Sequence, residues 1–179
     1  MASLAFTFFD APDSSKSAQV FVGVLEDRSA TQGHPIAYTI RVDGRSIGVY
    51  ASPAHGGSLV LSGTLEGMTK SHATVSGFGG TAQVKKEGHF KGAWAFTDFQ
   101  GSHYAWDVKF SGSKWRLLDS AKQEIASFDR TAWKSDIEGT LHIHLQIPDD
   151  LLALVLLTNK LVHNRVKSSE QASANIKPA

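Results

Sequence analysis

Apolar residues recur at every second position over most of the chain between Leu4 and Ile147. Clusters of Gly, Asp or Ser interrupt this pattern at short, regular intervals. Alternation with a period of two is typical of strands with one buried face, and many short strands at regular spacing are typical of a sandwich or barrel. We therefore predict a mainly β, antiparallel domain.

Several segments show the alternation clearly. Their apolar faces consist of Val20, Val22 and Val24; Ile36, Tyr38, Ile40 and Val42; Leu59, Leu61 and Leu65; and Leu141, Ile143, Leu145 and Ile147. Asp43-Gly44 follows one of these faces and predicts a tight hairpin, because Gly accepts the positive φ that such turns require. Between His103 and Arg130, short turns predict a meander of three antiparallel strands.

The pattern changes at Pro148, where a helix is expected to begin. Asp149 is a favourable N-cap, and Asp150 is a favourable charge in the first turn. The seven residues Leu151 to Leu157 are all apolar and therefore cover every side of a helix. Such a helix must be surrounded, and the rest of the chain supplies only strands. We predict a β-barrel closed around a central helix that ends near Lys167.

Composition and charge add limits on domains and partners. The chain has 179 residues, which suits one domain, assigned to residues 1–167, and its polar tail 168–179 is expected to be disordered. Lys and Arg total 18 against 17 Asp and Glu, so no global field favours nucleic acid or a membrane. An anionic partner must then be recognised by a local patch. Cysteine is absent, which excludes disulfides and zinc thiolate sites.

Two features predict a cytoplasmic protein without a transmembrane segment. Residues 1–10 contain no basic segment, and the apolar run Leu4 to Phe9 is shorter than a signal-peptide core. The polar residues 158–160 interrupt the apolar run of the helix well before it reaches the roughly 20 apolar residues that a bilayer span requires.

Candidate catalytic and metal-binding patterns are incomplete. His142 and His144 share one side of a predicted strand, but no third metal ligand is identifiable, so we expect a solvated polar face. His55-Gly56-Gly57 is similar to an esterase oxyanion loop but lacks a G-x-S-x-G elbow, and we expect a turn. Residues 77–80 are glycine-rich but lack a P-loop ending, which favours a hairpin. Adjacent Asp149 and Asp150 favour helix capping over catalysis. We expect no catalytic residues, metal or cofactor.

Aromatic residues offer a further candidate surface. Trp94, Trp106, Trp115 and Trp133 could stack on sugars or bases if they were exposed. Trp106 shares a face with other apolar residues, and Trp94 lies near Phe90 and Phe96, so we expect both in the core. The role of Trp133 stays open.

Basic residues provide the only local charge signal. Lys85, Lys86 and Lys91 bracket a predicted hairpin, and Arg41 and Arg45 flank the Asp43-Gly44 turn. Charged residues at turns are usually only solvated. The alternative is an anion-binding patch, and these five residues are the ligand-binding candidates.

Short segments in the last part of the chain carry a family resemblance. They are Tyr104-Ala105-Trp106, Trp115 to Asp119, Ala126 to Arg130, Gly139 to Ile143, and a terminal Asp-Leu-Leu helix. Their order resembles the tubby C-terminal-like superfamily, which includes Tubby, the phospholipid scramblases, plant LURP-one-related proteins and an uncharacterised fungal family. The fungal family is the most similar of these. The resemblance implies a twelve-stranded barrel around a hydrophobic C-terminal helix.

The resemblance also implies a class of function. Tubby binds phosphoinositides through basic residues, although its lysine-arginine signature does not align with this chain. Scramblases carry a cysteine cluster, which is absent here. Three hypotheses follow: a non-enzymatic module that binds anionic phospholipid at a membrane surface, a protein-interaction scaffold, and a hydrolase with an unidentified site. We expect the first.

Overall fold

The computed structural model describes residues 4–51, 57–87, 93–108, 112–131 and 136–175. Of the sequence candidates, His55, Gly56, Lys91 and Trp133 lie outside these residues. The elements in chain order are β1 (Leu4–Ala11), β2 (Ser14–Val22), a 3-10 turn (Ser29–Thr31), β3 (Tyr38–Asp43), β4 (Ser46–Ala51), β5 (Leu59–Glu66), β6 (His72–Gly77), β7 (Gly80–Lys86), β8 (Trp94–Thr97), β9 (His103–Val108), β10 (Lys114–Asp119), β11 (Glu124–Arg130), β12 (Ile137–Ile143) and α1 (Asp149–Ala174).

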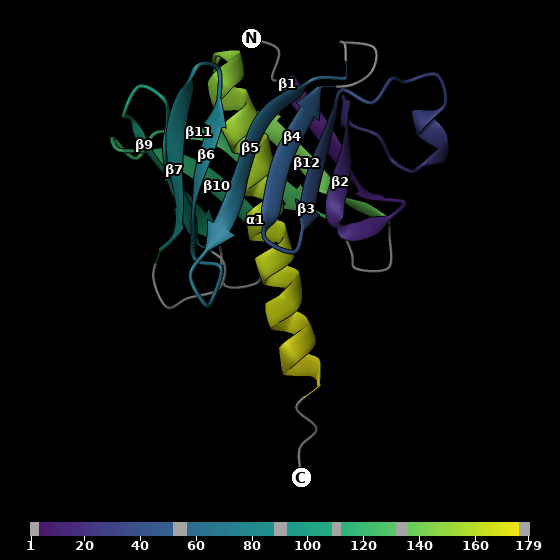
Figure 1. Cartoon of the computed structure of the whole chain (residues 1–179). Coiled ribbons are helices and arrows are strands. Elements are labelled where there is room, and N and C mark those ends of the chain that lie inside the picture. The colour runs from purple at the N-terminus through teal and green to yellow at the C-terminus, as the bar shows by residue number, and fades with distance from the viewer. Residues whose placement is uncertain (1–3, 52–56, 88–92, 109–111, 132–135, 176–179) are drawn as a thin grey trace.

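The strands form one closed antiparallel barrel. Each strand pairs with its neighbours in sequence, and β1 closes the sheet by pairing with β12. The predicted meander is confirmed as β9, β10 and β11. Figure 1 shows α1 running through the barrel and continuing beyond the end opposite the N-terminus. We call that end of the barrel the helix-exit end. The predicted fold, a twelve-stranded barrel around a C-terminal helix, is confirmed.

The core consists of the inward faces of the strands and the first turns of α1. All residues from Leu151 to Leu157 are buried, including Leu152, Val155 and Leu156, which point to different sides of the helix. This arrangement explains why the run has no polar face. Each leucine buried in this way stabilises the fold by about 1.5–3 kcal/mol relative to exposure.

The polar residues that follow this run are also buried, and strand tryptophans serve as their partners. Trp106 Nε1 donates a hydrogen bond to Thr158 Oγ1 at 2.8 Å, and Trp115 Nε1 donates to Asn159 Oδ1 at 2.7 Å. Buried polar groups are costly unless they are paired in this way. The interruption of the apolar run therefore marks two specific links between helix and barrel.

Both ends of α1 differ from the sequence prediction. Pro148, with extended backbone, occupies the N-cap position, and Asp149 is already helical because Leu152 N donates to Pro148 O at 2.9 Å. The helix continues to Ala174, beyond the predicted end at Lys167 and into the tail expected to be disordered. An ion pair between Arg130 of β11 and Glu170, at 3.0 Å, stabilises this extension.

Some strand limits also differ from the apolar pattern. β12 ends at Ile143, and Leu145 beyond it is 39% exposed. Val22 and Val24 are 52% and 62% exposed. Both segments lie at the end of the barrel where α1 begins, so their apolar side chains pass beyond the enclosed core. The alternation of apolar and polar residues therefore continues in the sequence beyond the last buried position of each strand.

The hairpins predicted at Asp43-Gly44 and at residues 77–80 are confirmed, the first with a shift of one position, and the turn predicted between Lys85 and Lys91 lies partly outside the described residues. Asp43 pairs with Ser46, so Gly44 and Arg45 are the central residues of the β3–β4 turn, and Gly44 has a φ of 59°. In the β6–β7 turn, Phe78 and Gly79 both have positive φ, at 49° and 76°. A pair of positive φ values is the requirement of a type I′ hairpin turn.

Candidate anion-binding pocket

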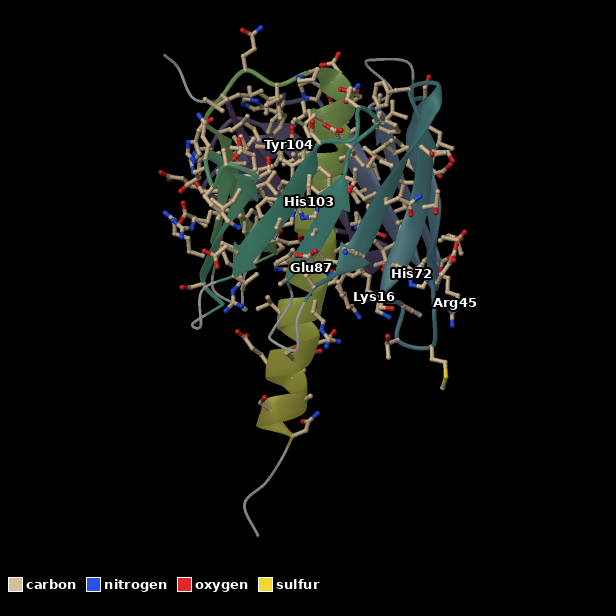
Figure 2. The ribbon with its side chains drawn as sticks, turned by 90° about the vertical axis from the view of Figure 1, so that its left-hand side faces the viewer. Lys16, Arg45, His72, Glu87, His103 and Tyr104 are labelled. Atoms are coloured by element: carbon tan, nitrogen blue, oxygen red, sulfur yellow. The ribbon has the colours of Figure 1, made fainter. Side chains whose placement is uncertain are left out.

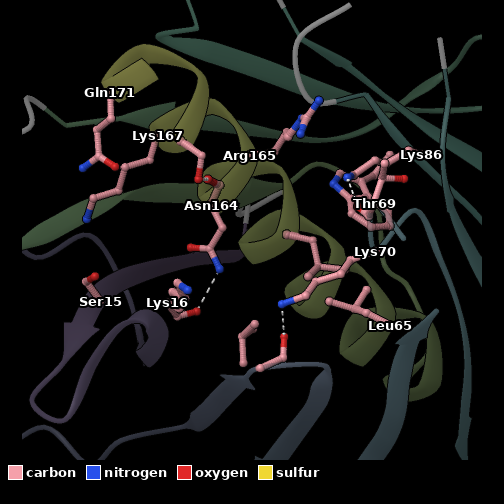
Figure 3. A pocket seen from close by; sticks show the side chains of 15 residues that line it. Ser15, Lys16, Leu65, Thr69, Lys70, Lys86, Asn164, Arg165, Lys167 and Gln171 are labelled. Atoms are coloured by element: carbon pink, nitrogen blue, oxygen red, sulfur yellow. Dashed lines mark hydrogen bonds between the residues drawn. The ribbon is translucent and has the colours of Figure 1, made fainter. Parts of the chain in front are cut away.

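A pocket of about 300 Å³ lies at the helix-exit end, between the last turns of α1 and the neighbouring strand ends and turns (Figure 3). We call it the basic pocket. Its lining residues are Ser15, Lys16, Val42, Gly44, Leu65, Thr69, Lys70, Lys86, Trp94, Leu161, Asn164, Arg165, Lys167, Ser168 and Gln171. They come from α1 and from the strands and turns between β2 and β8. No single segment of the sequence forms it.

The charges that line the basic pocket are all positive. They belong to Lys16, Lys70, Lys86, Arg165 and Lys167, and no Asp or Glu is among the lining residues. The whole chain has a formal charge of only +1, so this concentration of one sign is local. A concave site lined by one sign of charge raises the local concentration of oppositely charged ligands.

Strand geometry places Lys86 inside the pocket. Residues of β7 alternate between the two faces, and Lys86 follows the buried Ala82 and Val84 on the inward face. Its Nζ lies 5.5 Å from the ring centre of Trp94 and donates a hydrogen bond to Thr69 O at 2.8 Å. Burial, and secondarily the nearby Arg165, lowers the pKa of Lys86.

Two further contacts hold the walls of the pocket together. Lys70 Nζ donates to Gly44 O at 2.7 Å and so links the β5–β6 turn to the β3–β4 turn. Asn164 Nδ2 donates to Lys16 O at 2.9 Å and links α1 to the start of β2. Figure 3 shows both contacts, with Arg165 and Lys167 leaving α1 on different sides.

The pocket cations keep much of their capacity to bind an anion. Within the described residues, Lys16, Lys70, Lys86 and Arg165 form no ion pair with a carboxylate, and Lys167 Nζ lies 4.0 Å from Asp10 Oδ1. The partners of Lys70 and Lys86 are neutral backbone carbonyls. An ammonium group has three donors, so each of these lysines retains donors for a ligand.

Trp94 differs from the other described tryptophans. It lines the pocket with only 3% of its surface exposed, and its indole Nε1 has no hydrogen-bond partner among the described residues. Trp106 and Trp115, in contrast, donate to side chains of α1. Buried donors without a partner are rare in folded proteins. The prediction that Trp94 and Trp106 are buried is confirmed.

A buried ionic cluster lies beside the pocket. Lys160 and Glu138 form an ion pair with side chains only 0% and 2% exposed, and Lys160 Nζ also donates to Ser15 O, in the pocket lining. Burial raises the pKa of Glu138 to about 7, although Lys160 opposes this shift. Burial, and then the charge of Lys160, lowers the pKa of His163 to about 2. These three groups belong to the buried core beside the pocket and do not line it.

Of the five residues proposed from the sequence, Lys86 is the one that lines the pocket. Lys85 points to the outer face of β7, and its Nζ lies 3.5 Å from Glu87 Oε1. Lys91 lies outside the described residues. The neighbouring positions 85 and 86 therefore belong to opposite faces of the barrel wall.

The two arginine candidates are near the pocket but do not line it. Arg45 and Lys16 both lie near the helix-exit end in Figure 2. Arg45 Nη1 donates to Leu65 O at 3.1 Å and to Gly67 O at 2.9 Å, which supports the β5–β6 turn. The Arg41 guanidinium lies 5.1 Å from the ring centre of Tyr50 on the exposed side of β3.

His142, on β12, and His144, one residue after its end, contact residues of the neighbouring strand β11. His144 Nε2 lies 2.9 Å from Ser127 Oγ and 3.2 Å from Glu124 Oε1, and His142 Nε2 lies 3.7 Å from Asp129 Oδ2. Over the part of the chain that the structure describes, no group of three or more His, Cys, Asp or Glu is arranged to hold a metal ion. The same residues include no helix long and apolar enough to cross a membrane.

Fold and site together define a closed antiparallel barrel with a central C-terminal helix and a basic pocket where that helix emerges. The chain belongs to the Family of unknown function (DUF6593), which matches residues 24–166. The match includes Lys70, Lys86, Trp94 and Arg165 and leaves out β1 and β2. No curated protein and no solved structure matches the chain significantly.

Proposed function

We propose that this protein is a non-enzymatic binding module that recognises anionic phospholipid with the helix-exit end of its barrel. The observation that carries the proposal is the charge of the basic pocket, where Lys16, Lys70, Lys86, Arg165 and Lys167 meet without a lining carboxylate. We place the module at the cytoplasmic leaflet, where anionic lipids give the surface a negative potential.

An exposed apolar side chain beside the pocket supports a membrane surface as the partner. Met68 lies in the β5–β6 turn, two positions before Lys70, and is 100% exposed. An apolar side chain next to cations suits the boundary between headgroups and acyl chains. Each cation near an anionic surface contributes about 1 kcal/mol, so the affinity is expected to be modest and sensitive to salt.

Binding, and not catalysis, fits the chemistry of the lining. The hydroxyl groups of Ser15, Thr69 and Ser168 have no Asp, Glu or His beside them in the lining to accept a proton. A hydroxyl nucleophile normally needs such a base. The positive charge is therefore assigned to holding an anion.

We also propose that the chain is a distant relative of the tubby C-terminal-like superfamily. The support is the barrel closed around a C-terminal helix, which that resemblance implied. A shared scaffold is weak support for a shared ligand, because one fold hosts many activities. The lipid proposal therefore rests on the pocket.

Vesicle co-sedimentation with two charge-matched variants tests the proposal. One variant carries Lys70→Gln, Lys86→Gln and Arg165→Gln in the pocket. The control carries Lys85→Gln, Lys114→Gln and Arg116→Gln, which lie on the outer faces of β7 and β10. Both variants lose the same formal charge, so a difference between them does not come from net charge.

We expect wild type and control to pellet with phosphatidylserine vesicles at low salt and to dissociate near 1 M salt, where the Debye length is about 3 Å. The pocket variant should bind on the order of 100-fold more weakly, since it lacks three cations. Equal binding of the two variants, or no binding of wild type at low salt, contradicts the proposal and favours a protein-interaction scaffold.

A further inference from the structure

We propose that the basic pocket holds one phosphate monoester group, with the indole N–H of Trp94 as a hydrogen-bond donor and Lys86 and Arg165 as its charge partners. The inference rests on the proposed function, because it names the chemical group that the same end of the barrel recognises. It concerns a single defined site, whereas binding to an anionic surface requires only nearby positive charge.

The first argument is the unsatisfied donor of Trp94. Its indole is almost fully buried, yet Nε1 has no partner among the described residues. The buried indoles of Trp106 and Trp115 show that this barrel otherwise satisfies such donors. A ligand with an acceptor oxygen in the pocket would supply the partner that Trp94 lacks.

The second argument is the proximity of two like charges. Lys86 and Arg165 line the same pocket, and within the described residues neither forms an ion pair with a carboxylate. The charge of Arg165 adds to the lowering of the Lys86 pKa that burial causes. Holding two cations together is unfavourable unless an anion lies between them. A phosphate monoester carries about −1.5 to −2 charges at pH 7, more than a carboxylate or a phosphodiester.

The third argument is the shape of the site. Because α1 continues beyond the barrel rim (Figure 1), the pocket lies between the helix and the strand ends (Figure 3). A group that projects from its carrier can enter this pocket. A monoester presents three terminal oxygens, and a diester presents only two. The volume of about 300 Å³ also leaves room for a small polar carrier.

The carrier can be a soluble molecule or a lipid, and calorimetry separates the chemistry from the source. In one arm, wild-type protein is titrated with sn-glycerol 3-phosphate and with dimethyl phosphate at equal ionic strength. In the other arm, vesicles containing phosphatidic acid, a monoester headgroup, are compared with vesicles containing phosphatidylserine, a diester. We expect the monoester to bind at least about tenfold more tightly than the diester in one arm or both.

Two pocket variants and one control test the named residues. Trp94→Phe removes the N–H but keeps an aromatic ring, and Arg165→Gln changes an exposed residue of the helix. Each should weaken monoester binding about tenfold or more, because hydrogen bonds to charged groups are strong. Lys85→Gln, on the opposite face of β7, should leave it unchanged.

The outcomes distinguish this inference from the proposed function. Binding to phosphatidylserine and phosphatidic acid with equal affinity, together with no monoester preference in solution, overturns the inference and leaves surface binding intact. Monoester binding in solution without vesicle binding supports the inference and contradicts the lipid proposal. Monoester binding that both folded pocket variants retain overturns the assignment to Trp94 and Arg165.

Discussion

Lys86 and Trp94 are cross-strand partners on β7 and β8, and the Lys86 ammonium lies 5.5 Å from the centre of the Trp94 ring. This contact positions a cation at the mouth of the barrel, next to an indole whose N–H has no partner among the described residues. A cation over an indole face is stabilised by about 0.5–2 kcal/mol. The pair is therefore organised before any ligand arrives.

The central position of α1 predicts a severe effect of charge in the helix. Leu156 is 0% exposed and lies within the apolar run. Leu156→Asp places a carboxylate without a partner in the core, which costs several kcal/mol against a typical stability of about 5–15 kcal/mol. We expect loss of cooperative thermal unfolding, measured by circular dichroism. A cooperative transition at the wild-type temperature would contradict the packing around α1.

The buried ion pair predicts that a double variant is more stable than a single one. Lys160→Met leaves the Glu138 carboxyl buried without its cation and should reduce the free energy of unfolding by about 3–5 kcal/mol. Lys160→Met combined with Glu138→Leu removes both charges and should recover most of this loss. Urea unfolding at pH 8 measures both. If the double variant is less stable than Lys160→Met alone, the loss of stability in Lys160→Met does not come from an unpaired Glu138 carboxylate.

The pKa shifts of Glu138 and His163 predict opposing effects of pH on stability. The folded pKa of Glu138 is about 7 against an ordinary 4.5, so its contribution to stability falls as pH rises between these values. The folded pKa of His163 is about 2 against an ordinary 6.5, so its contribution rises with pH over that range. Between pH 4.5 and 6.5 the two contributions largely cancel, since each changes by about 1.4 kcal/mol per pH unit.

Removing the histidine tests this cancellation. In His163→Gln the opposing contribution is absent, so stability should fall relative to wild type by about 1.4 kcal/mol for each pH unit of increase within that window. Urea unfolding at several pH values gives both slopes. Equal slopes for the two proteins would mean that the folded protein protonates His163 as readily as the unfolded chain does.

Much of the fold was predictable because two kinds of pattern agree. Period-two alternation indicated strands, while Leu151 to Leu157, apolar on every side, required a surrounded helix. The end of the helix was not predictable from local composition. The extended part contacts the barrel through Arg130 and Glu170, which are far apart in sequence. Likewise, the N-cap is the residue whose carbonyl accepts the first helical hydrogen bond, and Pro148 and Asp149 are both compatible with a helix start.

The site was predictable only in part. Lys85 and Lys86 appear equivalent in the sequence, and the strand period that separates them was available from the alternation of Ala82, Val84 and Lys86. Lys70 and Arg165 gave no such signal, because their proximity to Lys86 comes from barrel closure around α1. The unsatisfied donor of Trp94 is a property of three-dimensional packing and has no mark in the sequence.

The most direct measurement of anion binding is the indole N–H resonance of Trp94 in nitrogen-15-labelled protein, assigned by its loss in Trp94→Phe. On titration with sn-glycerol 3-phosphate this resonance should shift strongly, because the N–H gains an acceptor. The N–H resonances of Trp106 and Trp115, already bonded to Thr158 and Asn159, should move little. A Trp94 resonance that stays in place at saturating probe, with or without binding elsewhere, would contradict a phosphate group in the basic pocket.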